Sequence, residues 1–225
     1  GIFYSPTINY VPPINGDGTS KANLSITAAK SDPFLNPSNT VNLQTNFPDV
    51  LWCTKTGPTA TERGDSSVCR APITTAGVYV YPNNTFKERV TINGGPYYYN
   101  LTGVQWCTTW SFTSCQANWS PTFNRPKYGT FSRFNITSAN CTPKCPSGRT
   151  YADELTNFAN WFGYYGTRMD LMKSAAGRAF AGLDENYRVG FMTIHTTSTS
   201  TEFLNINNFD ASHKTNWYNL FYGNI

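Results

Sequence analysis

The stretch NFANWFGYYGTRMDLMKSAAGRAFAGL, residues 157 to 183, carries the most regular apolar periodicity of the chain. Apolar side chains recur there at intervals of three and four, which is typical of one buried helix face. Thr150 or Ser147 can cap the start of this helix. Asp153 and Glu154 stand in its first turn, where carboxylates favour the helix dipole. We therefore predict one long core helix, with a buried face formed by Leu155, Phe158, Ala159, Phe162, Tyr165, Met169, Met172, Ala176 and Phe180.

Two glycines interrupt this pattern. Gly163 and Gly166 each cost a helix about 1 kcal/mol relative to alanine, so a kink or a close backbone contact is expected there. The segment DENYRVGFMTIHT then predicts a turn and a strand, whose apolar residues from Val189 to Ile194 suit a central strand covered on both faces. A second short strand is expected around 203–206. Last comes a helix with one apolar side, formed by Trp217, Leu220 and Phe221.

Residues 1 to 150 have a different composition and a different pattern of apolar residues. Short runs of β-branched and aromatic residues, broken by Gly, Pro and Asn turns, indicate antiparallel strands. We expect one hairpin between 78–80 and 86–92, and an aromatic strand over 97–106. The first fifty residues contain more Pro and Asn than strand, which favours an extended wrap over another part of the protein. The predicted division is a β-rich, cysteine-bearing insertion at 1–150 and a helix–strand–strand–helix section of an α/β core at 151–225.

Composition excludes some classes of protein. Of the 225 residues 13% are charged, the formal net charge is +4, and the Lys and Arg residues form no block. The electrostatic footprint of a nucleic-acid-binding protein is therefore missing. No run of about 18 apolar residues is present, so we expect no membrane span. Gly1 begins in mid-pattern, as though a leader or a preceding segment had been removed.

The six cysteines form three close pairs in sequence. Six cysteines allow about 15 pairings, and nearest-neighbour pairing is the simplest because each bridge would close one local loop. A zinc site is the rival, but it needs closer Cys spacing or a nearby histidine. Disulfides are favoured, and they indicate an oxidising compartment. The expected pairs are Cys53 with Cys69, Cys107 with Cys115, and Cys141 with Cys145.

Three segments resemble one bacterial family. ELTNFANWFGYYGTRMDLMKSAAGRAFAGLDENYRVGFMTI, followed by FLNINNFDASHKTNWYNLFY, is similar to the amino-terminal region of the PilC/PilY family, large proteins at the tips of type IV pili. GIFYSPTINYVPPINGDGTS at the start resembles the Tyr-Pro-rich segment of the same family. Residues 30 to 145 match only as the variable, cysteine-bearing insertion of the family.

The resemblance implies a fold and a role. The fold is an α/β, von Willebrand factor A-like (Rossmann-like) core section with a large β-rich insertion stapled by disulfides. The role is surface attachment, pilus assembly or priming with minor pilins, twitching motility and surface sensing. The implied location is extracellular, at the pilus tip after export through the periplasm, and the implied partners are minor pilins and a host or abiotic surface.

The family's metal-dependent adhesion site begins with Asp-x-Ser-x-Ser and continues with a later Thr and Asp. No position of this chain matches these ligands, because GIFYSP corresponds to the residues directly after the first motif and NWYNLFYGNI ends before the Thr loop. The chain is therefore interpreted as a section of a longer protein. No cofactor is expected in it, while the resemblance implies that the intact protein could bind a divalent metal.

Two candidate binding features lie in the insertion. Arg63, Gly64 and Asp65 form an Arg-Gly-Asp motif between Cys53 and Cys69, which could present Arg and Asp to an integrin; ordinary turn chemistry is the alternative. Aromatic residues could form a surface- or sugar-binding patch, or they could form cross-strand ladders. The candidates for such a patch are Trp106, Trp110 and Trp119.

Other functions have weaker support. A secreted carbohydrate-binding module of β-rich type is the alternative to the pilus interpretation. A glycosylated eukaryotic surface protein would use the six Asn-x-Ser/Thr sequons, which a chain rich in Asn and Thr also produces by chance. Catalysis is not expected, because the cysteines are predicted to be paired and the chain's histidines, His195 and His213, lie at a strand end and a helix start.

Overall fold

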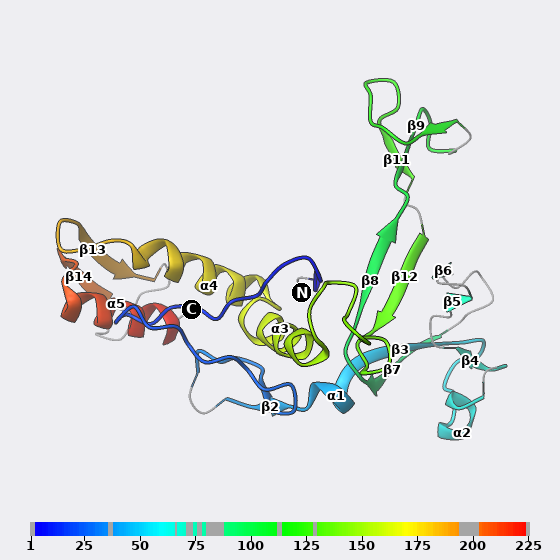
Figure 1. The fold of residues 1–225 in the computed structure, drawn as a ribbon, viewed down its shortest axis with the longest axis horizontal. Coiled ribbons are helices and arrows are strands. Elements are labelled where there is room, and N and C mark those ends of the chain that lie inside the picture. The colour runs from blue at the N-terminus through cyan, green and yellow to red at the C-terminus, as the bar shows by residue number, and fades with distance from the viewer. Residues whose placement is uncertain are drawn as a thin grey trace. The chain divides into compact units, whose positions relative to one another are not determined.

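The computed structural model describes residues 3–35, 38–65, 67–70, 74–75, 78–79, 88–111, 114–127, 130–193 and 203–223. The protein is mixed α/β with small sheets. It divides into two compact units, Gly1–Gln44 with Thr137–Ile225, and Thr45–Ile136. We call them the helical unit and the β unit (Figure 1).

The helical unit contains the three long helices. They are α3 (Tyr151–Tyr164), α4 (Arg168–Ala181) and α5 (Ala211–Gly223). Its strands form two small antiparallel sheets, one pairing β1 (Ala29–Lys30) with β2 (Thr40–Val41) and one pairing β13 (Arg188–Met192) with β14 (Phe203–Asn208). The short helix α1 (Leu43–Asn46) crosses the boundary between the units in sequence.

The single long helix predicted from about Tyr151 onward is two helices. Thr150 caps α3 and Thr167 caps α4, each accepting a hydrogen bond from the backbone N–H three residues later. Between them, a Cβ at Gly166 would lie 2.5 Å from the carbonyl oxygen of Phe162. The glycine therefore permits a tight break that another residue would obstruct. Capping at Thr150 was predicted and is confirmed.

The break changes which face of the second helix is buried. Leu155, Phe158 and Ala159 on α3 are buried as predicted. On α4 the predicted Met169 and Met172 are 49% and 40% exposed, so that part of the prediction is wrong. A new helix start resets the helical phase, and α4 instead buries Asp170, Lys173, Ser174 and Gly177.

One core cluster of the helical unit lies between α4, α5 and the β13–β14 hairpin. Trp217 is its centre, stacked on Phe180 at 4.4 Å and on Phe221 at 4.8 Å between ring centroids. Val189 and Phe191 of β13 pack against this cluster. The predicted burial of Trp217 and Phe221 is confirmed.

The expectation of a central strand covered on both faces is wrong for the part of this strand that the structure describes. Among the described strands β13 pairs with β14 alone, and Met192 on it is 65% exposed. Its apolar run reflects one face against α5 and one face directed outward. Ile194 lies outside the described residues.

The start of the chain lies extended along α3, as the predicted wrap requires. Asn157 accepts a hydrogen bond from the Tyr10 N–H at 2.7 Å and donates to the Ile8 carbonyl at 3.0 Å. Asn160 accepts from the Leu24 N–H at 2.9 Å and donates to the Tyr10 carbonyl at 3.0 Å. Each amide side chain pairs with an extended backbone much as a neighbouring strand would. Residues 1 to 44 therefore belong to the helical unit, and the compact units do not follow the predicted boundary at residue 150.

The β unit consists of short antiparallel sheets. Its strands and helix are β3 (Phe47–Cys53), α2 (Ala60–Arg63), β4 (Cys69–Arg70), β5 (Thr74–Thr75), β6 (Val78–Tyr79), β7 (Glu88–Gly94), β8 (Tyr97–Thr102), β9 (Gln105–Cys107), β10 (Cys115–Gln116), β11 (Arg125–Lys127) and β12 (Thr130–Asn135). The sheet orders are β4-β3-β7, β12-β8, β10-β9-β11 and β5-β6.

Strand pairing in the β unit differs in part from the prediction. β7 pairs with β3 along its whole length, and β6 pairs with β5, while residues 80–87 of the expected hairpin lie outside the described residues. The aromatic strand predicted over 97–106 is two strands, β8 and β9. Gly103 between them has φ +74°, a conformation that breaks an extended strand.

The three predicted disulfides are confirmed. Cys53–Cys69 joins cross-strand partners of β3 and β4, and Cys107–Cys115 joins partners of β9 and β10. Cys141–Cys145 precedes α3 and lies in the helical unit. The bridges fit the predicted oxidising compartment.

Candidate functional site

The Arg-Gly-Asp motif lies at the end of α2. Thr59 and Glu62 form a capping box at the start of this one-turn helix, Arg63 is its last residue, and Gly64 continues in a right-handed helical conformation. Asp65 comes next as a turn residue, accepting from the Ser67 N–H at 2.8 Å and from the Ser67 hydroxyl at 2.7 Å. The motif is exposed, so it can be presented to a partner, and Asp65 also performs the turn chemistry that was the alternative.

Electrostatics favour the charged forms of the carboxylates in this loop. Hydrogen bonds from the Ser67 hydroxyl and amide hold the pKa of Asp65 below its usual value. Glu62 accepts from Lys55 at 2.7 Å, and this bond with those from Thr59 lowers the pKa of Glu62 to about 2. A loop closed by Cys53–Cys69 therefore carries ionised carboxylates at neutral pH.

The predicted aromatic patch divides between surfaces. β9 lies between β10 and β11, beyond the end of the β8–β12 pair (Figure 1). Trp106 is half-buried and stands opposite Gln116 and Pro126, so these three residues share one face of the sheet. Cys107, Arg125 and Lys127 stand on the other face.

Trp110 belongs with this second face. Its indole is 63% exposed, and the Arg125 guanidinium carbon lies 4.9 Å from its ring centroid. Trp119 is 59% exposed on the turn after β10, where the Ser120 hydroxyl accepts from the Phe123 N–H at 3.1 Å. The structure thus joins Trp110 to a cation and separates both from Trp106.

Sequence reasoning missed Arg125. The signal that could have found it is charge patterning, because no Asp or Glu occurs from residue 89 to residue 152. The cations of this stretch are Arg89, Arg125, Lys127, Arg133, Lys144 and Arg149.

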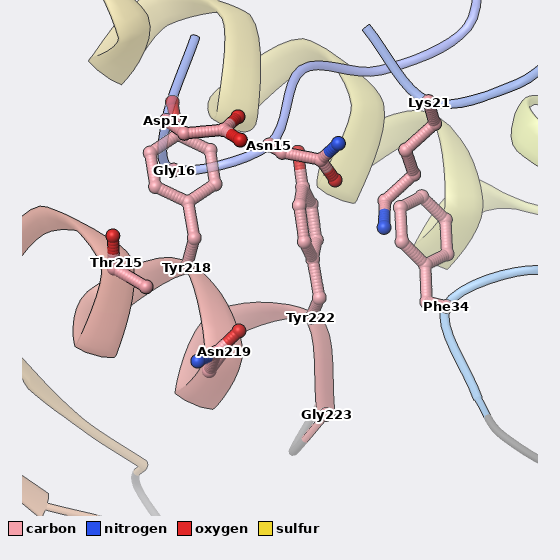
Figure 2. A pocket seen from close by; sticks show the side chains of 10 residues that line it. All are labelled: Asn15, Gly16, Asp17, Lys21, Phe34, Thr215, Tyr218, Asn219, Tyr222 and Gly223. Atoms are coloured by element: carbon pink, nitrogen blue, oxygen red, sulfur yellow. The ribbon is translucent and has the colours of Figure 1, made fainter. Parts of the chain in front are cut away.

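We call residues 3–35 the first segment. A pocket of about 300 Å³ lies in the helical unit between this segment and α5 (Figure 2). Figure 2 shows the Lys21 ammonium beside the rings of Tyr222 and Phe34, and it lies 4.9 Å and 5.8 Å from their centroids. Burial, followed by the charge of Lys30, lowers the pKa of Lys21. The pocket is lined by Asn15, Gly16, Asp17, Lys21, Phe34, Thr215, Tyr218, Asn219, Tyr222 and Gly223.

Several polar groups of this pocket already have structural partners. The Tyr222 hydroxyl donates to the Ile14 carbonyl at 2.7 Å, and the Tyr218 hydroxyl donates to the Gly177 carbonyl. Asp17 accepts from the Thr19 hydroxyl at 2.6 Å. The pocket offers hydrogen bonds and one cation to a small polar molecule, and no sequence motif indicated it.

The histidines and acidic residues form no candidate metal-binding cluster where the chain is described. His213 shares a hydrogen bond of 2.7 Å with the Val189 carbonyl and helps to fix α5 on β13, whereas His195 lies outside the described residues. No group of three or more His, Cys, Asp or Glu side chains gathers within the described ranges in a way that could hold a metal ion. None of the helices in those ranges is long and apolar enough to cross a membrane.

Comparison with family models, with curated proteins and with solved structures finds no match.

Proposed function

We propose that the chain is a section of a bacterial type IV pilus tip adhesin of the PilC/PilY family. It acts in surface attachment, in pilus assembly with minor pilins and in surface sensing. The helical unit is a section of a von Willebrand factor A-like core, and the β unit is the variable insertion that contacts the surface. Binding, not chemistry, is its mechanism.

One observation carries this proposal. The segments that resemble the family, at 1–20 and from residue 154 onward, fold together in the helical unit. Asn157 and Asn160 of the NFANWF string form hydrogen bonds that hold the first segment on α3. Residues 45–136, most of the chain between those segments, form a separate unit with two disulfides. One unit that carries the resembling segments, with a separate disulfide-bearing unit inserted between them, supports the interpretation.

Immunoelectron microscopy on the producing bacterium tests the proposal. Antibodies against the 225-residue chain are expected to label the free ends of pili, and the label should disappear with genetic loss of pili. Label spread over the cell body, or found only in the medium of non-piliated cells, would refute the pilus assignment.

A secreted carbohydrate-binding module is the second candidate. It is favoured by the exposure of two tryptophans, Trp110 and Trp119, on the β9 sheet and its turn. This function predicts saturable glycan binding that depends on these side chains and persists without pili.

A further inference from the structure

The β unit contains a complete recognition arrangement for a carboxylate. The Arg133 guanidinium carbon lies 3.9 Å from the Tyr97 ring centroid, so the guanidinium lies close to the ring. Its two terminal nitrogens donate to the two oxygens of Asp49 at 2.8 Å and 2.7 Å. A planar fork held against an aromatic ring matches the geometry of a carboxylate and is preorganised to bind it.

The β9 sheet repeats this arrangement without the carboxylate. Arg125 lies over Trp110, as Arg133 lies over Tyr97. Within the described residues Arg125 belongs to no ion pair, and both partners of this stack are exposed. The surrounding sequence from 89 to 152 has no acidic residue to complete it. The Arg125 fork is therefore available to a carboxylate from a partner.

We infer that this face of the β9 sheet binds a carboxylate-bearing polysaccharide. The inference rests on the proposed adhesive function and names its ligand class. Arg125 pairs with a sugar carboxylate through its fork, and Trp110 provides the ring against which the sugar stacks. Lys127 is two residues further along the same strand face, about 7 Å away, and offers a second cation to the next charged unit.

The neighbouring side chains favour a sugar over other anionic partners. Gln105 stands opposite Lys127. The hydroxyls of Thr109 and Ser111, on either side of Trp110 in sequence, lie 2.7 Å apart and share a hydrogen bond. Such groups satisfy sugar hydroxyls by hydrogen bonding. Binding of a nucleic acid requires more cations to neutralise its phosphates than this face has. Binding to a bilayer requires a larger apolar surface.

The test measures binding of the purified 225-residue chain, with its disulfides intact, to immobilised polygalacturonate. We expect saturable binding that weakens as salt is raised from about 50 to 200 mM, and little binding to neutral dextran. Trp110→Ala should weaken it by about tenfold, the scale of a lost aromatic stacking partner. Arg125→Gln should weaken it by about tenfold as well.

Two further variants distinguish the effect of the Arg125 fork from the effects of net charge and of misfolding. Arg125→Lys keeps the charge but loses the fork, so it should behave like Arg125→Gln. Arg89→Gln removes an exposed cation from β7 of the same unit and should bind within about twofold of the parent. Equal losses in Arg125→Gln and Arg89→Gln would overturn the site, because they would show a response to net charge alone.

Other polymers decide the ligand class. Equal or tighter binding to poly-glutamate, to dextran sulfate, to oligo-dT or to phosphatidylserine vesicles would overturn the assignment to a carboxylated sugar. Absence of polygalacturonate binding would overturn it too. Because the purified chain is used, these outcomes are independent of the location of the protein. Label away from pilus tips would refute the pilus assignment while sugar binding could persist.

Discussion

Arg133 and Asp49 form a bidentate ion pair in which both side chains are largely withdrawn from water, 12% and 10% exposed. The pair joins β12 to β3 and so ties together two sheets that share no strand. Leu51, Cys53, Cys69 and Val90 form a small buried apolar cluster on the β4-β3-β7 sheet, and the ion pair adds a polar link from this sheet to β12.

Removing the Asp49 charge is expected to destabilise the β unit strongly. Asp49→Asn leaves the Arg133 guanidinium without its counter-charge, and loss of one partner of a buried pair costs about 3–5 kcal/mol. Urea unfolding followed by tryptophan fluorescence measures the loss. Lys55→Gln, which breaks the exposed pair with Glu62, is the matched control and should leave the midpoint nearly unchanged. Equal midpoints for both variants would contradict the role of the pair.

The two asparagines of α3 should control protection of the first segment. Asn160→Leu leaves the Leu24 N–H and the Tyr10 carbonyl without these partners, and each unsatisfied buried group costs about 1–3 kcal/mol. Amide hydrogen exchange at Leu24 should become much faster. Asn216→Leu on the exposed side of α5 is the control. Unchanged exchange at Leu24 in Asn160→Leu would argue against the clamp.

Gly163 is expected to be essential for the close packing of the first segment on α3. A Cβ there would lie 2.4 Å from the Leu24 Cδ1 and 2.8 Å from the Lys30 carbonyl oxygen. Gly163→Ala should therefore lower the free energy of unfolding by about 1–3 kcal/mol. Gly182→Ala, where nothing lies within 4 Å and φ is −79°, should be neutral or slightly stabilising. An unchanged free energy of unfolding in Gly163→Ala would show that the first segment packs less closely on α3 than described.

The loop with the Arg-Gly-Asp motif should lose stability in acid. The folded pKa of Glu62 is about 2, below its ordinary value of 4.5, first because of the Lys55 hydrogen bond and then because of Thr59. A lowered folded pKa stabilises the loop above pH 4.5, and this stabilisation disappears as the pH falls through about 2. NMR titration should show the Glu62 pKa rising in Lys55→Gln. An unchanged Glu62 pKa in that variant would refute the role of Lys55.

The sequence predicted what depends on local pattern. The Thr150 cap, the apolar face of α3 and the aromatic face of α5 follow from residues close in sequence. The disulfide pairs were predictable because each closes a short loop. The extended first segment followed from its Pro and Asn content, although its partners on α3 did not.

The sequence could not predict features that depend on tertiary contacts or on the helical phase of α4. The break at Gly166 shifted the buried face of α4, and β3 pairs with β7 although residues 54–87 lie between them in sequence. The stack of Arg125 on Trp110 likewise depends on β11 returning beside β9. The Arg-Gly-Asp motif and the aromatic patch stay predictions, now with defined surroundings.

The most direct test of adhesion through the β unit is the detachment force of single pili, measured on a surface with the native protein altered in place. Cys107→Ala with Cys115→Ala removes the bridge between β9 and β10, which is expected to cost this sheet about 2–3 kcal/mol. With pilus number and protein level unchanged, the detachment force should fall. An unchanged force would contradict the proposal that the disulfide-closed β unit makes the contact.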